Sequence, residues 1–375
     1  MALTLALAAT GSAVAYDVND RLAINGLLAG AGQCQEITGG TPLPTLCRGA
    51  LAFQPEVSYT PTKQDQLFAK LDFAGWNGLN PVSPFVLLPW AATLEADVHR
   101  INGSNRNYLL EAWYAHTFAF AADNSVQLTG GIIDPTRYVD GNAFANDEYT
   151  QFMNEVFINP HNGFIPAYDW GGAAVWKLGH WTFNGVGINV TKNSDGYNYN
   201  WFAGEVGYTL TTGLGEGNYR LMYAGTSRAF LSPAPATDPN ADPSTSMNPP
   251  APSKQRRSAL MLSCDQELGK VFGVFLRVSS QTQDALVDYG WEYAGGFNVK
   301  GSAWGREDDN IGLGVAYLQG GNGDLAGTKV FETYYRLAIN AHIGLSADVQ
   351  YMQDRYRVGA STDGWIFGLR AVAGF

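Results

Sequence analysis

The sequence predicts an all-β protein: a transmembrane antiparallel β-barrel, with sixteen strands, in which one long connection folds inward as a constriction loop. Three observations lead to this prediction. Apolar and polar residues alternate with a period of two along many segments, which places them on opposite faces of a strand. The expected strands are about 10 to 14 residues long, longer than typical soluble strands. Short and long connections also alternate along the chain, as in bacterial outer-membrane barrels.

The composition suits a wall that is apolar on one face and wet on the other. Of the 375 residues, 15% are charged, below the usual ~25%, whereas 44 are Gly and 13% are aromatic. Mean hydropathy is -0.13, so the chain is not apolar on average. The net charge of -11 argues against a nucleic-acid partner, whose phosphates need a basic surface. In a pore, this charge would favour cations.

Residues 1–15 form a short apolar run that ends in Ala13-Val14-Ala15, typical of a secretory signal and its cleavage site. The positively charged start of such a signal is missing, so we expect the given sequence to begin inside it. A short buried helix or strand is the alternative. The run is too short to be a membrane-spanning helix, and no later apolar stretch reaches the ~18 residues that such a helix needs. We therefore predict a signal-like segment over 1–15 and one barrel domain over 16–375.

Alternation is clearest in the last expected strand, where Trp365, Phe367 and Leu369 share one face and Arg370 lies on the other. We expect charged residues on that second face to meet water. The sixteen expected strands cover residues 20–34, 49–62, 65–76, 106–120, 124–134, 171–178, 181–190, 198–211, 217–229, 256–268, 271–280, 286–299, 308–319, 328–339, 342–354 and 364–375. An even number fits a closed barrel, and eighteen strands remain an alternative.

Aromatic residues crowd the expected strand ends, as interfacial girdles do. They are Trp76, Trp113, Trp176, Trp181, Tyr208, Trp291 and Trp365. The long connections, 35–48, 77–105, 135–170 and 230–255, all fall on one side of the wall. The last is rich in Pro, Ala, Ser and Asp, and we expect it to be a disordered external loop.

Cys34 and Cys47 flank a Gly/Pro/Thr segment in the first long connection. In an exported protein this spacing predicts a disulfide, with two free thiols as the alternative. Cys264 lies in an apolar strand pattern, and we expect it to be a small lipid-facing or packed residue.

Residues 134–168 read neither as strand nor as low-complexity linker. A loop of this length is usually functional or disordered, and its aromatic residues argue against disorder. We interpret it as a loop folded into the lumen, where it narrows a pore. A surface lid with no role in selection is the alternative.

The stretch GGIIDPTRYVD followed by GNAFANDEYTQF, residues 130–152, resembles the carbohydrate-selective porin family known as OprB-like. PWAATLEADVHRINGSNRNYLLEAWYAHTF and GREDDNIGLGVAY agree with this resemblance, which covers most of the chain. It implies a sixteen-stranded outer-membrane barrel through which sugars diffuse. The cysteine pair and the Pro-rich connection depart from the pattern, and they leave open whether the protein is a homotrimer or a monomer.

A sugar-selective channel needs hydrogen-bond donors, acceptors and aromatic faces, with binding weak enough for release. The inner faces of the expected strands supply Lys70, Asp72, Glu111, Trp113, Arg220, Arg277, Glu332, Arg336 and Asp348. The folded loop supplies Arg137, Asp140, Asn142, Asp147 and Glu148. For each residue the alternative is a structural ion pair or a solvated wall charge, and Asn142 could instead attach the loop to the wall.

The HExxH, GxSxG, P-loop and CxxC motifs are absent, and the five histidines lack metal-ligand spacing. We therefore predict a passive-diffusion porin rather than an enzyme, with no cofactor and no metal. Its expected partners are small sugars or other small hydrophilic solutes and the lipid of the bacterial outer membrane. The alternatives are a general cation-preferring pore and a structural or adhesive barrel with a plugged lumen.

Overall fold

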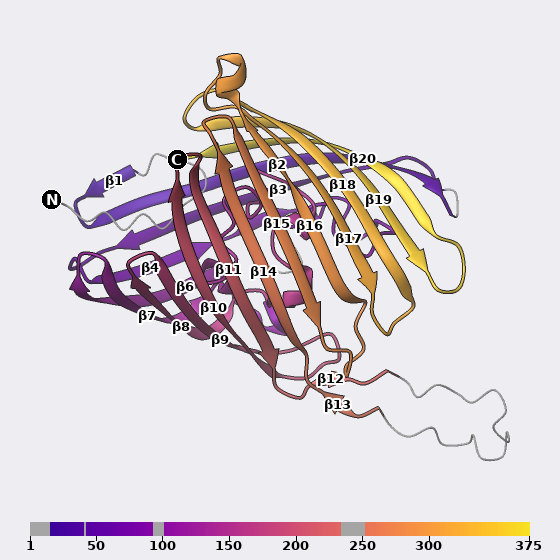
Figure 1. Ribbon diagram of the computed structural model, residues 1–375, viewed down its shortest axis with the longest axis horizontal. Coiled ribbons are helices and arrows are strands. Elements are labelled where there is room, and N and C mark those ends of the chain that lie inside the picture. The colour runs from indigo at the N-terminus through magenta and orange to yellow at the C-terminus, as the bar shows by residue number, and fades with distance from the viewer. Residues whose placement is uncertain (1–15, 41–42, 93–100, 234–251) are drawn as a thin grey trace.

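The computed structural model describes residues 16–40, 43–92, 101–233 and 252–375. Within these residues the chain forms a closed antiparallel barrel with sixteen wall strands (Figure 1). The strands are β2 (Leu22–Gly39), β3 (Leu46–Tyr59), β4 (Asp65–Leu71) continued by β5 (Phe73–Gly75), β6 (Leu109–Ala121), β7 (Asn124–Ile133), β8 (Asp169–Leu178), β9 (Trp181–Val190), β10 (Tyr199–Thr212), β11 (Gly215–Thr226), β14 (Ser258–Leu268), β15 (Phe272–Gln281), β16 (Tyr289–Lys300), β17 (Asn310–Gly320), β18 (Leu325–Ala338), β19 (Ile343–Tyr356) and β20 (Thr362–Gly374). The predicted fold class and strand number are confirmed.

The barrel closes between its first and last long strands. β2 pairs with β20 from Leu27, opposite Gly374, to Gly39, opposite Asp363. β1 (Tyr16–Asn19) pairs with β2 beyond the end of β20. Because every wall strand has a neighbour on both sides, the barrel leaves no open sheet edge.

β2 and β3 both extend further into their shared connection than the predicted strands 20–34 and 49–62. β2 continues to Gly39 and β3 begins at Leu46, so the cysteines lie inside the strand ladder and not in its connection. Cys34 is directly opposite Cys47, and the two form the predicted disulfide. The predicted signal-like segment, 1–15, lies outside the described residues. So does most of the Pro-rich connection, whose two ends pair as β12 (Phe230–Leu231) and β13 (Lys254–Gln255).

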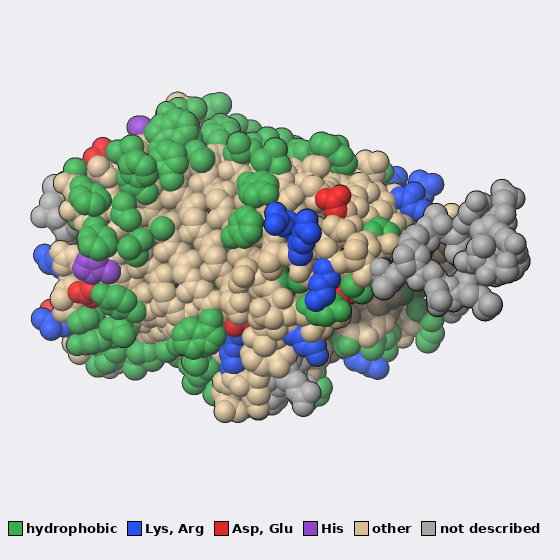
Figure 2. Space-filling model, turned by 90° about the horizontal axis from the view of Figure 1, so that it is seen from below, with side chains coloured by type: hydrophobic (Ala, Val, Ile, Leu, Met, Phe, Trp, Pro, Cys, Tyr) green, Lys and Arg blue, Asp and Glu red, His purple; other side chains and the backbone are tan. Residues whose placement is uncertain are grey.

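The two faces of the wall differ as the alternation predicts. On β20, Leu369 is 70% exposed, whereas its neighbour Arg370 is 2% exposed. Hydrophobic side chains spread over the outer wall in Figure 2, and most visible Lys and Arg side chains lie toward the end with the long connections. We call this end the long-loop end and the opposite one the short-turn end.

Most of the predicted girdle aromatics lie on the outer face, and one does not. Trp76, Trp176, Trp181, Trp291 and Trp365 are exposed. Trp113 instead shares the inner face with Glu111 and stacks on Phe68 with ring centroids 4.9 Å apart. The expectation that Trp113 belongs to a girdle is therefore wrong, because its register points it inward.

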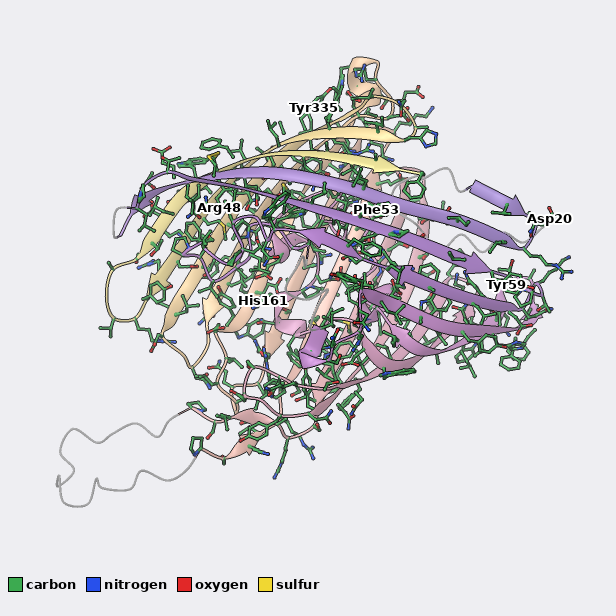
Figure 3. The ribbon with its side chains drawn as sticks, turned by 180° about the vertical axis from the view of Figure 1, so that it is seen from behind. Asp20, Arg48, Phe53, Tyr59, His161 and Tyr335 are labelled. Carbon is green, nitrogen blue, oxygen red and sulfur yellow. A yellow bond between two sulfur atoms is a disulfide. The ribbon has the colours of Figure 1, made fainter. Side chains whose placement is uncertain are left out.

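Residues 134–168, which we call the constriction loop, lie within the ring of strands, as the position of His161 in Figure 3 shows. The loop contains the 3-10 turns η2 (Pro135–Arg137), η3 (Glu155–Phe157) and η4 (His161–Gly163). In the described part of the chain, no helix is both long and apolar enough to cross a membrane.

Part of the lumen is a dry hydrophobic core. Phe152 and Phe157 of the constriction loop pack there with Leu87, which lies between β5 and β6, and with Tyr334 and Met352 of the wall. The expectation that charged side chains on the inner face meet water is therefore wrong for this part of the barrel. The constriction loop packs against the inner face of the wall there, and its side chains shield that face from solvent.

Candidate functional site

Arg277 of β15 holds the middle of the constriction loop. Its guanidinium donates to the carbonyl oxygens of Ala145, Phe157 (2.8 Å) and Ile158 (3.2 Å). It also forms an ion pair with Asp140 of the loop at 2.7 Å, and both side chains are fully buried. Because a guanidinium presents several donors in a fixed plane, one side chain can hold two separate turns of the loop.

Arg137 holds the beginning of the loop. Nε and Nη2 of Arg137 donate to the two carboxylate oxygens of Glu111 on β6, each at 2.9 Å. Trp113 donates from Nε1 to the same carboxylate at 3.1 Å. The Arg137 guanidinium also lies 4.9 Å above the centroid of the Phe68 ring, close enough for a cation–π interaction.

Further wall residues hold the loop backbone. The buried carboxylate of Glu332 on β18 accepts from the backbone N–H groups of Met153 and Asn154. Arg370 of β20 donates to the carbonyl oxygens of Glu148 (2.6 Å) and Gln151 (2.7 Å). Such charge-assisted hydrogen bonds are about twice as strong as neutral ones, so they fix the position of the loop against the wall.

Between the loop and the rest of the wall lies a cavity of about 1390 Å³. This is larger than the ~300–1,000 Å³ of a typical ligand pocket. It reaches Tyr168 and Arg257, near the long-loop end, and Asn340 and His342, in a turn at the short-turn end. The lining residues therefore come from both ends of the barrel, as a lengthwise passage requires.

The predicted site residues divide into two groups. Five of them line the cavity: Lys70, Arg137, Asp147, Glu148 and Arg336. The other nine lie outside its lining: Asp72, Glu111, Trp113, Asp140, Asn142, Arg220, Arg277, Glu332 and Asp348. All nine have partners within the protein. Asp140 and Asn142 belong to the constriction loop, and the wall residues Glu111, Arg277 and Glu332 contact it.

The contacts of the second group are mainly with other side chains or with the loop backbone. Asn142 donates to the Ser263 hydroxyl (3.3 Å) and the Cys264 carbonyl (3.2 Å), which attaches the loop to β14. Asp72 accepts from Gln54 at 3.1 Å. The remaining members include Arg220, paired with Asp265 at 2.6 Å, and Asp348, which accepts from Gln350 at 2.9 Å.

Sequence reasoning missed several residues that line the cavity, namely Gln54, Glu56, Glu155, His161, Arg257 and Lys300. The alternation along β3 contained the signal for Gln54 and Glu56, because Phe53 and Val57 point outward. Glu155 and His161 lie in the loop, where no periodic pattern indicates which side chains meet the lumen.

Burial changes the titration of three loop side chains that line the cavity. It raises the pKa of Glu148 to about 7, helped by the neighbouring charge of Asp147. It also raises the pKa of Glu155 to about 7. Burial lowers the pKa of His161 to about 4, with a contribution from Arg257. The imidazole is therefore neutral at pH 7, whereas the two carboxyl groups are only partly ionised and can both donate and accept hydrogen bonds.

No group of three or more His, Cys, Asp or Glu side chains in the described ranges is placed to hold a metal ion.

A closed sixteen-stranded barrel with an inward-folded loop beside a polar passage is the architecture of a porin. The family model described as OprB, carbohydrate-selective porin, matches residues 91–375. The chain therefore belongs to the OprB family of carbohydrate-selective porins, as the sequence resemblance indicated, and it is a porin with a preference for carbohydrates.

Solved structures share the fold at low sequence identity. OprB of Pseudomonas putida at high pH matches with a TM-score of 0.75 and 13% identity, covering 95% of this chain and 94% of that one. The outer membrane channel DcaP of Acinetobacter baumannii matches with a TM-score of 0.55 and 12% identity, covering 94% and 97%. An uncharacterised protein of Aquifex aeolicus is 24% identical over 274 residues, which are 72% of each chain.

Proposed function

We propose that small neutral sugars diffuse passively through the cavity between the constriction loop and the inner faces of β3 and β4, in a bacterial outer membrane. The observation that carries this proposal is the mixed polar lining beside the loop. Lys70 and Arg137 provide donors, whereas Glu56, Asp147 and Glu148 provide acceptors. A sugar hydroxyl both donates and accepts, so it can exchange water for either kind of partner without leaving a charge uncompensated.

The residues would have two kinds of role. Lys70, Arg137, Asp147 and Glu148 would contact the solute, and Arg336 would act near the short-turn end. Arg277, Glu332, Glu111 and Asp140 would act as positioning residues, because their contacts are with the loop. Residues 1–15 would be the export signal that an outer-membrane location requires.

The test is swelling of proteoliposomes by a neutral hexose and by a zwitterionic amino acid of similar size. We expect faster swelling with the hexose. Equal rates would contradict sugar preference, and no swelling with either solute would contradict an open passage.

A cysteine placed at Ala143 tests whether the solute uses this cavity. Ala143 lines the cavity and is exposed. A bulky thiol reagent should slow hexose swelling in Ala143→Cys and leave the wild type unchanged, because Cys264 points from β14 toward the outside of the barrel and the other two cysteines are paired. Equal effects on both proteins would place the passage elsewhere.

One observation favours a second candidate, a general cation-preferring pore. Eight Asp and Glu residues line the cavity, against five Lys and Arg residues. An acidic passage raises the local concentration of cations. The reversal potential in a salt gradient separates the two candidates: a strongly cation-selective pore that does not discriminate hexose from zwitterion would replace the sugar proposal.

A further inference from the structure

The outer wall carries two basic side chains where a barrel usually presents apolar ones. Lys329 of β18 and Arg355 of β19 are both exposed, and both alternate with buried residues of the inner face, Val330 and Asp354. By strand register, they are the only Lys or Arg side chains on the outer face of the wall strands in the described ranges. A charge on this face is tolerated only near the edge of the hydrocarbon layer.

These two residues are neighbours on adjacent strands. Lys329 is opposite Gln353 on β19, and Arg355 is opposite Gly327 on β18, two residues from Lys329. On the other side of β18, Tyr317 of β17 is opposite Lys329. The Tyr317 hydroxyl lies 3.6 Å from the position that a Cβ atom would occupy at Gly327. The hydroxyl is therefore directed toward Gly327, the residue of β18 that lies opposite Arg355. We call Lys329, Arg355, Tyr317 and Gln353 the outer cationic patch.

The patch lies at the height of the aromatic girdle of the long-loop end. In the adjoining strands, Trp291 and Tyr293 on β16 and Trp365 on β20 are exposed on the same face. β18 begins at Leu325 and β19 ends at Tyr356, so both cations are within a few residues of this end. Girdle aromatics mark the level of the lipid headgroups, and long basic side chains can extend toward that level.

Neither cation has a partner in the described part of the protein. Among the described residues, no ion pair and no side-chain hydrogen bond involves Lys329 or Arg355. The nearest carboxylate along the same row, Asp363, is opposite Gln353 on β20. Thr38 of β2 donates to Asp363 at 2.7 Å, and the carboxylate lies beside the position that a Cβ atom would occupy at Gly39 of β2.

We propose that the outer cationic patch binds the phosphate group of a glycolipid in the outer leaflet of the membrane. A phosphate offers several acceptor oxygens and a negative charge, which match a lysine, an arginine and a tyrosine hydroxyl on one surface. The apolar side chains below the patch, among them Phe331 and Val349, would contact the acyl chains of the same lipid. The inference rests on the proposed membrane location but not on the identity of the transported solute.

Native mass spectrometry of the full-length protein, released from detergent with added lipid A, tests the proposal. Lipid A carries two phosphates, and the same glycolipid without phosphates is the comparison probe. We expect the double variant K329Q/R355Q to retain lipid A about thirtyfold less tightly, since each basic residue near a charged lipid surface contributes about a fivefold change in affinity. K329R/R355K should retain most of the binding.

A matched control removes two exposed cations elsewhere. R48Q/K192Q changes the net charge equally, at positions outside the patch, and should bind lipid A like the wild type. Equal retention by K329Q/R355Q and the wild type, or equal binding of the dephosphorylated glycolipid, would overturn the proposal. Displacement of lipid A by excess inorganic phosphate alone would reassign the patch to free phosphate. Swelling of proteoliposomes in a neutral hexose, measured with the same protein preparations, tests the proposed transport separately from lipid A binding.

Discussion

Arg137 of the constriction loop and Glu111 of β6 form a two-point ion pair, with both N–O distances at 2.9 Å. The carboxylate is fully buried, whereas the arginine side chain is 29% exposed. Arg137 is thus both the attachment of the loop to the wall and part of the cavity lining. The same side chain connects the position of the loop with the chemistry of the passage.

Replacing Arg137 by Met should destabilise the barrel by about 3 kcal/mol, because it leaves the Glu111 carboxylate buried without its counter-ion. The double variant E111Q/R137M should recover much of this loss, because it removes the uncompensated charge. Urea unfolding in lipid vesicles measures both values. A loss below about 0.5 kcal/mol for R137M, within the range of ordinary surface substitutions, would show that the pair does not stabilise the fold.

Replacing Arg277 by Lys should release part of the loop. A lysine ammonium cannot reach all of the carbonyl oxygens that the guanidinium contacts, together with Asp140. We expect a larger and noisier single-channel conductance as the loop moves away from the wall. Arg220→Lys is the matched control, since Arg220 pairs with Asp265 of the neighbouring strand, and its conductance should stay near that of the wild type. Identical traces for R277K and the wild type would remove Arg277 from the positioning residues.

Much of the wall could be predicted from the sequence because strand alternation is local. Two neighbouring residues are enough to predict that Leu369 points outward and Arg370 inward. The inward direction of Lys70 can be predicted in the same way. The environment of Arg370 could not be predicted, because it depends on Glu148, which lies 222 positions away along the chain. The same limit applies to Arg277, which contacts the loop 119 or more residues away. A period of two predicts which face a side chain occupies, and the fold of the loop decides whether that face meets water.

The break in the third wall strand illustrates a second limit. The alternation runs without interruption through Asp72, yet β4 ends at Leu71 and β5 begins at Phe73. The backbone N–H of Asp72 donates to the carbonyl of Tyr108, in the connection before β6. Such a bulge depends on the path of the neighbouring connection, for which the local sequence contains no signal.

Cation selectivity should increase as the pH rises through about 7. Burial raises the pKa values of Glu148 and Glu155 to about 7, so both carboxyl groups are neutral well below this pH and negative well above it. The negative charges of Asp147 and Asp134 also raise the pKa of Glu148, whereas the positive charge of Lys70 lowers it. Reversal potentials between pH 5.5 and 8.5 should show the change in the wild type, a smaller change in Glu148→Gln, and almost none in E148Q/E155Q. A flat profile in the wild type would contradict the assignment.

Removing the Cys34–Cys47 disulfide should leave the barrel closed. The flanking residues already pair along the whole of β3, from Leu22 opposite Tyr59 to Gln35 opposite Leu46. The bond closes a loop with a sequence separation of 13, for which about 3 kcal/mol of stabilisation is typical. C34S/C47S should therefore unfold at lower urea concentration while hexose swelling stays unchanged. A loss of swelling in folded protein would show that the disulfide shapes the passage.

The most direct test of sugar passage beside the constriction loop is the block of single-channel current by a neutral hexose, titrated for the wild type and for Lys70→Gln. Lys63→Gln, in an exposed turn, is the control. We predict a saturable block in the wild type and in K63Q, weakened about fivefold in K70Q, the effect of losing one hydrogen bond of about 1 kcal/mol. A current that no hexose concentration alters, or an equal block in all three proteins, would contradict the account.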